Sequence, residues 1–307
     1  MKRDFLMVTD FSRDEIVEVF ELTKDLKRYL REGKEYTPLR GKTMAMIFAK
    51  PSARTRISFE TGMYQLGGYA IYLSPNDIGI GKREAIKDIA RVVSRYNDII
   101  MARLFDHWHI EELARYSSVP VINGLTDLTH PCQVMADLFT VYEKKGRYEN
   151  IKIAFVGDGS NNVANSWVNM ASRMALELVI VTPEAYLPDK SALENARKVG
   201  VSEIKIEHDP VKGVSGADVI YTDVWVSMGQ ESEKELKMKA FEGFQVNSEL
   251  LKYAKDDVMV MHCLPAHRGE EITDEVIDGP NSIVFDEAEN RLHVQKAIIL
   301  KLFGLAR

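Results

Sequence analysis

The stretch Lys50-Pro51-Ser52-Ala53-Arg54-Thr55-Arg56 decides the fold, because it joins two segments with different hydrophobic patterns. Before it, residues 43–49 form a continuous apolar run, which predicts a buried strand. After it, apolar residues recur at helical spacing over 57–66. Pro51 ends the strand, and Ser52 is a residue type that caps helix N-termini. The sequence therefore predicts a strand, a turn and the start of a helix.

This turn has the composition of an anion site. The first turn of a helix has free N–H groups and a partial positive charge, so it attracts anions. Ser52 and Thr55 add hydroxyl donors, and Arg54 adds a guanidinium that binds phosphate in a fixed fork. A capped helix with two solvated arginines is the competing interpretation, and the short spacing alone favours it. Other stretches of the chain must therefore decide between an anion site and a capped helix with solvated arginines.

The composition is that of an ordinary globular protein. The chain has 307 residues, 45% of them hydrophobic and 28% charged, which is enough for two domains. Its net charge is -6 and no Lys/Arg-rich tract stands out, which argues against binding to nucleic acid or an anionic membrane. Two widely separated cysteines, Cys132 and Cys263, are typical of a reducing compartment. We expect a soluble, cytoplasmic protein without a signal peptide or membrane span.

The chain alternates strands and helices in two successive halves. The strands expected in the first half are 43–49, 69–73, 98–103 and 119–123. Those expected in the second half are 151–156, 176–181, 204–206, 218–222 and 258–261, with an edge strand at 282–285. A loop of turn residues is expected at 74–82. This alternation predicts an α/β fold with mainly parallel sheets flanked by helices.

A polar break at 146–150 separates the two halves. We therefore expect two doubly wound domains, the first over 1–146 and the second over 147–286. The final helix, within 287–307, is expected to pack back on the first domain. The active site is expected in the cleft between the two domains.

Polar side chains follow most of the predicted strands, and ligands bind at the carboxyl ends of strands in open parallel sheets. The candidates in the first half are Ser52, Arg54, Thr55, Arg103, His130 and Gln133. Those in the second half are Asn162, Asp223, Ser227, Met228 and Cys263. The first set suits a phosphate-bearing substrate, and Asp223 suits a cationic group on a second substrate. These residues predict a reaction between an anion and an amine.

Several candidates also have plain structural interpretations. Gly157-Asp158-Gly159 hints at a dinucleotide loop, but Asn162 stands where the third glycine is required, so we interpret the stretch as a tight turn. His262 and His267 flank Cys263 without completing a metal-ligand spacing, so no zinc site is expected. Taken singly, four further residues have more common roles: His130 at a helix start, Cys263 as a buried cysteine, Met228 in the core and Arg291 as a solvated arginine.

Five motifs in chain order resemble those of the aspartate/ornithine carbamoyltransferase family. Ser52-Ala53-Arg54-Thr55-Arg56 resembles its Ser-Thr-Arg-Thr-Arg loop, and His130-Pro131-Cys132-Gln133 matches its His-Pro-x-Gln motif. Asp223-Val224-Trp225-Val226-Ser227-Met228-Gly229 and His262-Cys263-Leu264-Pro265 match segments of its ornithine-specific members. Phe285-Asp286-Glu287-Ala288-Glu289-Asn290-Arg291 resembles the start of their last helix. The resemblance spans nearly the whole chain.

The resemblance implies transfer of the carbamoyl group from carbamoyl phosphate to the δ-amine of L-ornithine, without cofactor or metal. The products would be L-citrulline and phosphate, in arginine biosynthesis or its reverse. The implied carbamoyl phosphate site consists of Ser52, Ala53, Arg54, Thr55, Gly79, Arg103, His130, Gln133, Cys263, Leu264 and Arg291. Of these, the implied catalytic residues are Arg54, Arg103, His130 and Cys263. The implied ornithine site consists of Asn162, Asp223, Ser227 and Met228, with Asn165 as a competitor for the place of Asn162. A homotrimer or an assembly of trimers is also implied.

Two positions depart from the family pattern. Ala53 replaces the usual threonine, so a hydroxyl is lost while a backbone N–H remains. Gly79 falls where many relatives carry a glutamine that reaches a neighbouring subunit's site. If subunits share sites here, either Lys82 or the loop backbone replaces that contact, or the contact is absent. Three other functions remain open: a carbamoyltransferase for putrescine or aspartate, a nucleotide-dependent oxidoreductase, and a binding protein without catalysis.

Overall fold

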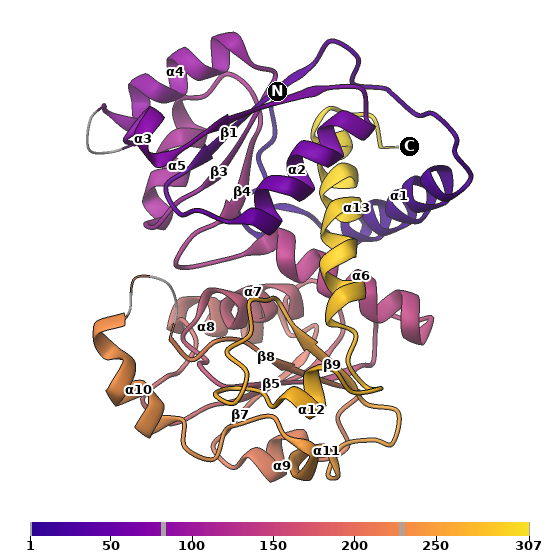
Figure 1. Ribbon diagram of the computed structural model, residues 1–307, viewed down its shortest axis with the longest axis vertical. Helices are drawn as coiled ribbons and strands as arrows, with labels where there is room; N and C mark the ends of the chain where they lie inside the picture. Colours follow the sequence, from indigo (N-terminus) through magenta and orange to yellow (C-terminus); the bar gives the residue numbers. More distant parts are fainter. Residues whose placement is uncertain (1, 81–83, 227–228, 230, 307) are drawn as a thin grey trace. The chain divides into compact units, whose positions relative to one another are not determined.

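The computed structural model describes residues 2–80, 84–226, 229 and 231–306 (Figure 1). The chain divides into two compact units, Met1–Ala136 with Glu289–Arg307, and Asp137–Ala288. Among the described residues, none of the helices combines the length and the apolar content that a membrane span requires.

The first unit is built on a four-stranded parallel sheet. Its strands are β1 (Thr43–Phe48), β2 (Tyr69–Leu73), β3 (Ile99–Arg103) and β4 (Val121–Leu125), in the order β2-β1-β3-β4. The main helices beside it are α1 (Arg13–Arg31), α2 (Ala53–Gln65), α4 (Ile86–Tyr96) and α5 (His107–Tyr116). Two short helices are η1 (Val8–Asp10) and α3 (Pro75–Ile78). Strand β1 is buried along almost its whole length because it lies inside the sheet, whereas the edge strand β2 is partly exposed.

The second unit is built on a five-stranded parallel sheet. Its strands are β5 (Lys152–Val156), β6 (Glu177–Val181), β7 (Glu203–Glu207), β8 (Val219–Thr222) and β9 (Met259–His262), in the order β7-β6-β5-β8-β9. Its helices are α7 (Asn162–Ala171), α8 (Lys190–Val199), α9 (Pro210–Val214), η2 (Glu231–Glu233), α10 (Lys234–Ala240), α11 (Ser248–Leu251) and α12 (Asp274–Ile277). Residues of several strands and helices form its core, among them Val156, Ile220, Phe241 and Val260.

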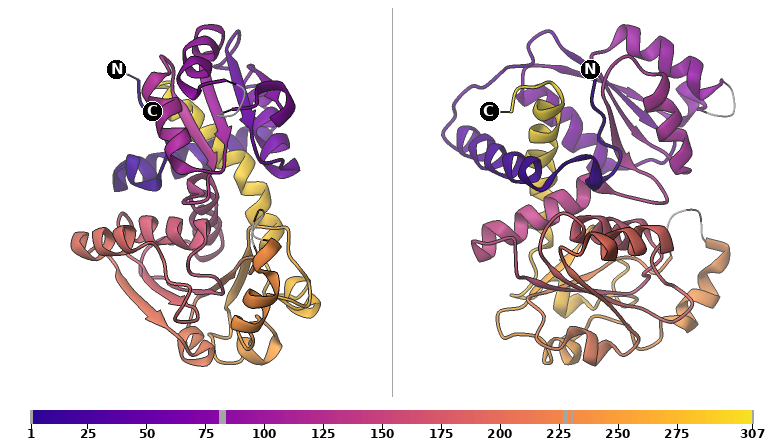
Figure 2. Two further views of the ribbon diagram at one scale, coloured as in Figure 1. Left: turned by 90° about the vertical axis from the view of Figure 1, so that its left-hand side faces the viewer. Right: turned by 180° about the vertical axis from the view of Figure 1, so that it is seen from behind.

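Two helices belong to both units. The chain leaves the first unit within α6 (Pro131–Lys145) and returns to it within α13 (Val284–Leu302). Both helices are continuous, and α13 is drawn in yellow in the further views (Figure 2). The units therefore divide between Ala136 and Asp137, ten residues before the boundary expected from the polar break. The reason is that the break follows the end of α6, whereas the division falls inside that helix.

The later part of α13 packs within the first unit. The Lys296 Nζ donates a hydrogen bond to Gln65 Oε1 at 2.6 Å, which attaches α13 to the end of α2. The Lys27 Nζ on α1 donates to Asn290 Oδ1 at 2.7 Å. These contacts fix α13 beside α1 and beside α2, the helix that Ser52 caps.

The predicted α/β class with two parallel sheets is confirmed, but two local predictions are wrong. Nine of the predicted strands are present, with bounds within two residues of those expected. The edge strand expected at 282–285 is absent, because Val284 already begins α13 and only Ser282 forms a bridge, to Val260. The loop expected at 74–82 contains the short helix α3, which has Pro75 in its first turn.

A buried ion pair attaches α10 to the sheet of the second unit. The Lys237 Nζ lies 2.6 Å from Asp158 Oδ2, and the two side chains are 2% and 1% exposed. Asp158 follows β5, and its other oxygen accepts a hydrogen bond from the backbone N–H of Ser160 at 2.9 Å. Removing one member of such a pair leaves the other charge buried and uncompensated, which is strongly destabilising.

We expect Lys237→Met to lower the free energy of unfolding by about 3–5 kcal/mol, because it leaves the Asp158 carboxylate buried without its partner. The matched control is Lys252→Met, since Lys252 and its partner Glu249 are 65% and 79% exposed. Exposed pairs contribute less than about 1 kcal/mol. Urea denaturation followed by tryptophan fluorescence measures both variants, and equal losses would contradict the prediction.

Candidate functional site

In the first unit, the predicted anion-binding residues gather at the carboxyl ends of the inner strands β1 and β3 and of the edge strand β4. Strand β1 leads into Ser52, β3 ends with Arg103, and β4 leads into the segment that contains His130. The strand order reverses between β1 and β3, which run parallel with Phe48 beside Arg103. Open α/β sheets bind their ligands at such a reversal. The topology therefore places Ser52 and Arg103 on either side of the preferred ligand position.

The Ser52 cap forms as the sequence predicts. Its Oγ accepts a hydrogen bond from the backbone N–H of Thr55 at 3.3 Å and donates to the Thr55 hydroxyl at 3.1 Å. The Nη2 of Arg291, on α13, donates to the same Thr55 hydroxyl at 3.1 Å. Arg291 is 4% exposed, so the solvated arginine considered above is the wrong interpretation. The last helix therefore brings a third guanidinium to the start of α2.

His130 lies among these cations. It is 3% exposed, and burial is the main reason why its pKa lies well below the ordinary value of 6.5. The positive charges of Arg291, Arg103 and Arg54 lower this pKa further, because they disfavour a protonated imidazole. A neutral imidazole can donate a hydrogen bond to an oxygen without adding another charge. Gln133 is buried in the first turn of α6, and its backbone N–H donates to the His130 carbonyl at 3.1 Å.

Lys50 is a residue of this region that the sequence did not single out. It is 4% exposed, its Nζ pairs with an Asp127 carboxylate oxygen, and it lies 4.4 Å from the centre of the Phe105 ring. Its backbone N–H donates to the Arg103 carbonyl at 3.4 Å. Lys50 thus links the segments that follow β1, β3 and β4. The only sequence signal was a lysine placed between a buried strand and Pro51.

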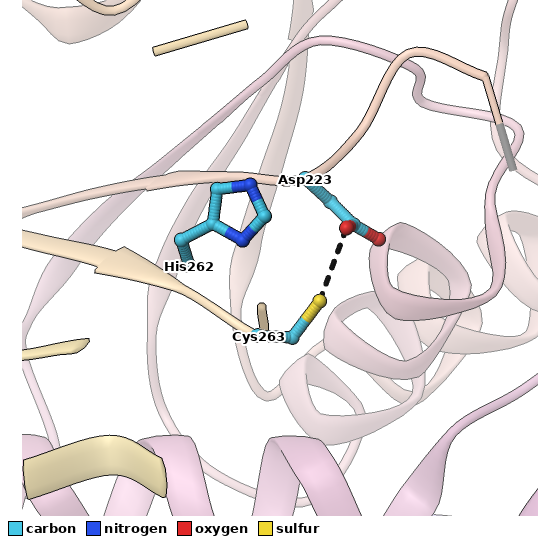
Figure 3. A group of neighbouring side chains, drawn as sticks. All are labelled: Asp223, His262 and Cys263. Atoms are coloured by element: carbon cyan, nitrogen blue, oxygen red, sulfur yellow. Dashed lines mark hydrogen bonds between the residues drawn. The ribbon is translucent and has the colours of Figure 1, made fainter. Parts of the chain in front are cut away.

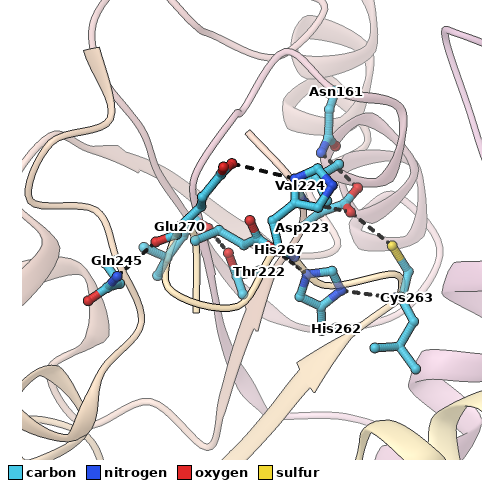
Figure 4. Close-up of polar contacts among 12 residues, drawn as sticks. Asn161, Thr222, Asp223, Val224, Gln245, His262, Cys263, His267 and Glu270 are labelled. Carbon is cyan, nitrogen blue, oxygen red and sulfur yellow. Dashed lines mark hydrogen bonds and ion pairs between the residues drawn. The ribbon is translucent and has the colours of Figure 1, made fainter. Parts of the chain in front are cut away.

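In the second unit, Asp223 is the centre of a buried hydrogen-bond network (Figure 3). Its Oδ1 accepts from Cys263 Sγ at 3.0 Å and from the Val224 N–H at 2.8 Å. Its Oδ2 accepts from Asn161 Nδ2 at 3.0 Å, as the wider view shows (Figure 4). Asp223 follows β8 and Asn161 follows β5, and the strand order of this sheet reverses between these two strands. The acidic group therefore lies at the position where such a sheet binds ligands.

Burial governs the protonation of this network. It raises the pKa of Asp223, and it raises the pKa of the Cys263 thiol well above the ordinary value, with Asp223 adding to the effect. Cys263 is therefore a neutral thiol that donates a hydrogen bond, and the thiolate is disfavoured. Asp223 Oδ2 accepts one hydrogen bond from Asn161 and retains a lone-pair site.

The asparagines that follow β5 differ in their hydrogen-bond partners. Asn161 caps α7, because its Oδ1 accepts from the Ala164 N–H at 2.8 Å, while its amide contacts Asp223. Sequence reasoning missed this role, although the asparagine at a helix start was visible. Asn165 Oδ1 accepts from the Asp189 N–H at 2.8 Å, so this side chain serves the loop before α8. Asn162 is the first residue of α7 and is partly buried.

The remaining predicted residues are placed as follows. Leu264 has a left-handed backbone with φ of 59°, and its N–H donates to His262 Nδ1 at 2.9 Å. Ala53 is the first residue of α2. Gly79 ends α3 beyond the edge strand β2, with a left-handed φ of 52°. Ser227, Met228 and Lys82 lie outside the described residues.

The donor atoms of Asp223, His262 and Cys263 lie within 4.8 Å of one another, a spacing that could hold a metal ion. However, both ring nitrogens of His262 already have protein partners. Nδ1 accepts from the Leu264 N–H, so Nε2 carries the proton and donates to Glu271 Oε1 at 3.0 Å. A metal ion would have to displace one of these buried hydrogen bonds. The trio is therefore built as a hydrogen-bond network and does not fit a resident metal.

The two halves of the chain match the two domains of one family. Residues 3–143 match "Aspartate/ornithine carbamoyltransferase, carbamoyl-P binding domain", and residues 149–302 match "Aspartate/ornithine carbamoyltransferase, Asp/Orn binding domain". The chain belongs to the aspartate/ornithine carbamoyltransferase family, which confirms the resemblance seen in its motifs.

Individual relatives carry a more specific name. The ornithine carbamoyltransferase of Thermococcus kodakarensis is 55% identical over 98% of this chain and 96% of its own length. The anabolic ornithine carbamoyltransferase of Pyrococcus furiosus is 53% identical over 98% of this chain and 96% of its own length. The crystal structure of the anabolic ornithine carbamoyltransferase from Campylobacter jejuni superposes with a TM-score of 0.94 at 40% identity, covering 99% of both chains.

We expect the His130 imidazole to remain neutral when the pH falls from 7 to 5.5, because burial and three guanidinium groups disfavour its protonated form. Long-range ¹H–¹⁵N NMR measures its titration, and His130→Gln assigns its signals. The control is the urea-unfolded protein, in which the histidines have a pKa of about 6.5. His130 binds a proton more tightly in the unfolded chain than in the folded one. It therefore lowers the free energy of unfolding as the pH falls below the unfolded-state pKa. Titration of native His130 near its ordinary pKa would contradict the arrangement.

Proposed function

We propose that the protein transfers the carbamoyl group of carbamoyl phosphate to the δ-amine of L-ornithine and releases L-citrulline and phosphate. The observation that carries this proposal is that the buried His130 and the arginines Arg54, Arg103 and Arg291 all belong to the carboxyl edge of one sheet, where Arg291 donates to the hydroxyl of Thr55. Membership of the carbamoyltransferase family and the relatives named above support the proposal. They favour ornithine over aspartate or putrescine, and they give no support to an oxidoreductase.

The first unit supplies groups that suit the phosphate of carbamoyl phosphate. The hydroxyls of Ser52 and Thr55, the N–H groups of the first turn of α2 from Ala53 onward, and the guanidinium of Arg54 form one side of this site. Arg103 contributes from the end of β3. Arg291 supports the same loop through its hydrogen bond to Thr55. Several charge-assisted hydrogen bonds to one dianion favour tight binding.

The carbamoyl oxygen gains negative charge as the amine attacks, so donors aimed at this oxygen lower the barrier. Arg54, Thr55, Arg103 and His130 are the proposed donors, and the neutral Cys263 thiol is a further one. Gln133 and the backbone carbonyl of Leu264 are proposed to orient the carbamoyl amide. The left-handed backbone of Leu264, held by His262, supports a fixed direction for that carbonyl.

The second unit supplies groups that suit ornithine. Asp223 is proposed to hold the α-ammonium group with its remaining lone-pair site, and Asn162, Ser227 and Met228 to contact the α-amino and α-carboxyl ends. The hydrogen bond from Asn161 supports the orientation of the Asp223 carboxylate. The amine must be neutral to attack, although an alkyl amine has a pKa of about 10.4. Cys263, hydrogen-bonded to Asp223, is proposed to help select the neutral form.

In the proposed reaction, the protein mainly positions the two substrates and forms no covalent bond to either of them. The δ-nitrogen forms a bond to the carbonyl carbon, the bond from that carbon to the phosphate oxygen breaks, and the amine proton leaves with the phosphate. Holding two substrates in reacting geometry and stabilising the oxygen charge can account for most of the acceleration.

The proposal extends to the assembly, the location and the metabolic direction of the protein. A homotrimer or an assembly of trimers would cover the apolar side chains that α2 and β2 expose, since Tyr64 is 79% and Tyr69 67% exposed. Gly79 is proposed to contribute through its backbone at the site. The free cysteines fit action in the cytoplasm, and the relatives described as anabolic favour arginine biosynthesis.

Arg54→Ala is expected to raise the KM for carbamoyl phosphate by about 10²-fold or more, because a charge-assisted contact to the phosphate is lost. Arg56→Ala is the matched control, since Arg56 pairs with Glu60 at 3.0 Å and stacks on Tyr72 at 4.0 Å. Citrulline formation measures both variants. Equal losses in the two variants, or retained activity in Arg54→Ala, would remove Arg54 from the site.

Asp223→Asn is expected to raise the KM for ornithine at least about tenfold, with a small effect on carbamoyl phosphate, because a carboxylate that pairs with the substrate ammonium is lost. Asp218→Asn is the control at the opposite end of the same strand, since Asp218 pairs with Lys255 at 2.8 Å. Steady-state kinetics with each substrate varied in turn measure the effect. Similar changes in both KM values would speak against a divided site.

A further inference from the structure

Two buried carboxyl groups of the second unit have no task in the reaction proposed above. Asp137, on α6, and Glu287, on α13, are both fully buried at 0% exposure. Their carboxyl groups are hydrogen-bonded to each other. Two carboxylates in contact cannot both remain ionised away from water, and a hydrogen bond between them requires a proton on one. The pair is therefore a carboxyl group bonded to a carboxylate.

Glu287 also connects this pair to the sheet. Its Oε2 accepts from the backbone N–H of His262 at 3.0 Å, and its Oε1 accepts from the Tyr221 hydroxyl at 3.2 Å. His262 is the last residue of β9 and Tyr221 lies on β8. Both anchoring groups are fully buried. Glu287 thus fixes the strand end from which Cys263 and Leu264 follow.

The pair also lies where the chain passes between its two compact units. Asp137 is the first residue of the second unit, and Glu287 lies two residues before the chain returns to the first. Along α6, Asp137 follows Gln133 by four residues, and along α13, Glu287 precedes Arg291 by four residues. Residues four apart share one face of a helix. The hydrogen bond therefore joins the two helices that carry Gln133 and Arg291.

The surroundings of the pair resist a second negative charge. Titratable groups beside it include Tyr221 on β8, His262 on β9 and Cys263 directly after β9, and Asp223 lies beyond Cys263, to which it is hydrogen-bonded. Burial, followed by Asp137, raises the pKa of Glu287 well above its ordinary value. Burial and the same carboxyl groups raise the pKa values of Tyr221 and Cys263. The pair is therefore expected to keep its shared proton at neutral pH.

We propose that Asp137 and Glu287 are positioning residues that share one proton and hold α6, α13 and the His262–Leu264 segment in the arrangement needed for transfer. The proposal rests on the carbamoyl transfer proposed above. Both carboxyl groups are fully buried, so in this proposal they act through the groups that they hold. Loss of the shared proton places two negative charges in contact and loosens the attachment of the two helices.

The test compares variants that keep or remove the hydrogen bond. Glu287→Gln and Asp137→Asn replace the shared proton by an amide donor, whereas Glu287→Ala removes the contact. In Glu287→Gln the amide oxygen can still accept from the His262 N–H, and the Tyr221 hydroxyl can accept from the amide nitrogen instead of donating to an oxygen. Lys144→Met is the matched control, because Lys144 joins the same helices through an exposed pair with Asp286 at 2.9 Å. Citrulline formation is measured from pH 7 to 10 with both substrates varied, and thermal unfolding is measured for every variant.

At pH 7, Glu287→Ala is expected to lower kcat by at least about tenfold with smaller changes in both KM values, because small displacements of positioned groups slow the reaction strongly. Glu287→Gln is expected to stay within about threefold of the parent, since its amide replaces the shared proton. Between pH 7 and 10, the ratio of kcat in Glu287→Gln to kcat in the parent is expected to rise at least about threefold, because only the parent has this proton to lose. Asp137→Asn is expected to behave similarly, and Lys144→Met is expected to follow the parent at every pH.

The outcomes separate this proposal from the proposed function. No turnover by the parent protein would overturn carbamoyl transfer itself. Turnover by the parent with a constant ratio in Glu287→Gln from pH 7 to 10 would overturn the shared proton. A kcat for Glu287→Ala within threefold of the parent would overturn the positioning role. If Glu287→Ala does not fold, the pH profiles of Glu287→Gln and Asp137→Asn decide the matter.

Discussion

Parallel alignment of neighbouring strands is the constraint on which both candidate sites depend. Because every strand in a sheet points the same way, the residues that follow the strands meet at one edge. In the first unit this edge collects Ser52, Arg103 and His130, and in the second it collects Asp223 and Cys263. Side chains that are far apart in the chain thereby become neighbours, and helix N-termini face the same edge. The scaffold itself thus accounts for the position of the chemistry.

The two units carry opposite electrostatic characters. In the first, the positive charges of Arg54, Arg103 and Arg291 lower the pKa of the buried His130, and these four side chains are hydrogen-bond donors for an anion. In the second, the acidic group is Asp223, and burial raises the pKa of the neighbouring Cys263 thiol, which therefore stays neutral. This division suits a reaction between an anionic carbamoyl donor and an amine. The buried Asp137–Glu287 pair adds a further acidic group, which is best understood as a structural link beside this chemistry.

Much of the local structure follows from short-range rules. A serine cap and the change from continuous to helical apolar spacing predict the start of α2, and Ser52 does accept the Thr55 N–H. Buried strands also follow from their apolar runs. The rules failed at 282–285, where an apolar run belongs to α13, because a short run fits a strand and a buried helix turn equally well. They also overlooked Asn161 and Lys50, whose partners Asp223 and Asp127 lie 62 and 77 residues away.

The sequence by itself determined the α/β class, the residue types at the strand ends and, through its motifs, the family. These features depend on periodicity, capping and composition, which act over a few residues. Only the tertiary structure decided the order of the strands, and hence that the reversals fall between β1 and β3 and between β5 and β8. It showed the hydrogen bond from Arg291 to Thr55 across 236 residues, where the motifs had implied only that both belong to one site, and it joined α6 to α13 through Asp137 and Glu287. Such contacts form because distant helices and strands bury their apolar faces together, and nothing in the local sequence specifies which partner each face will meet.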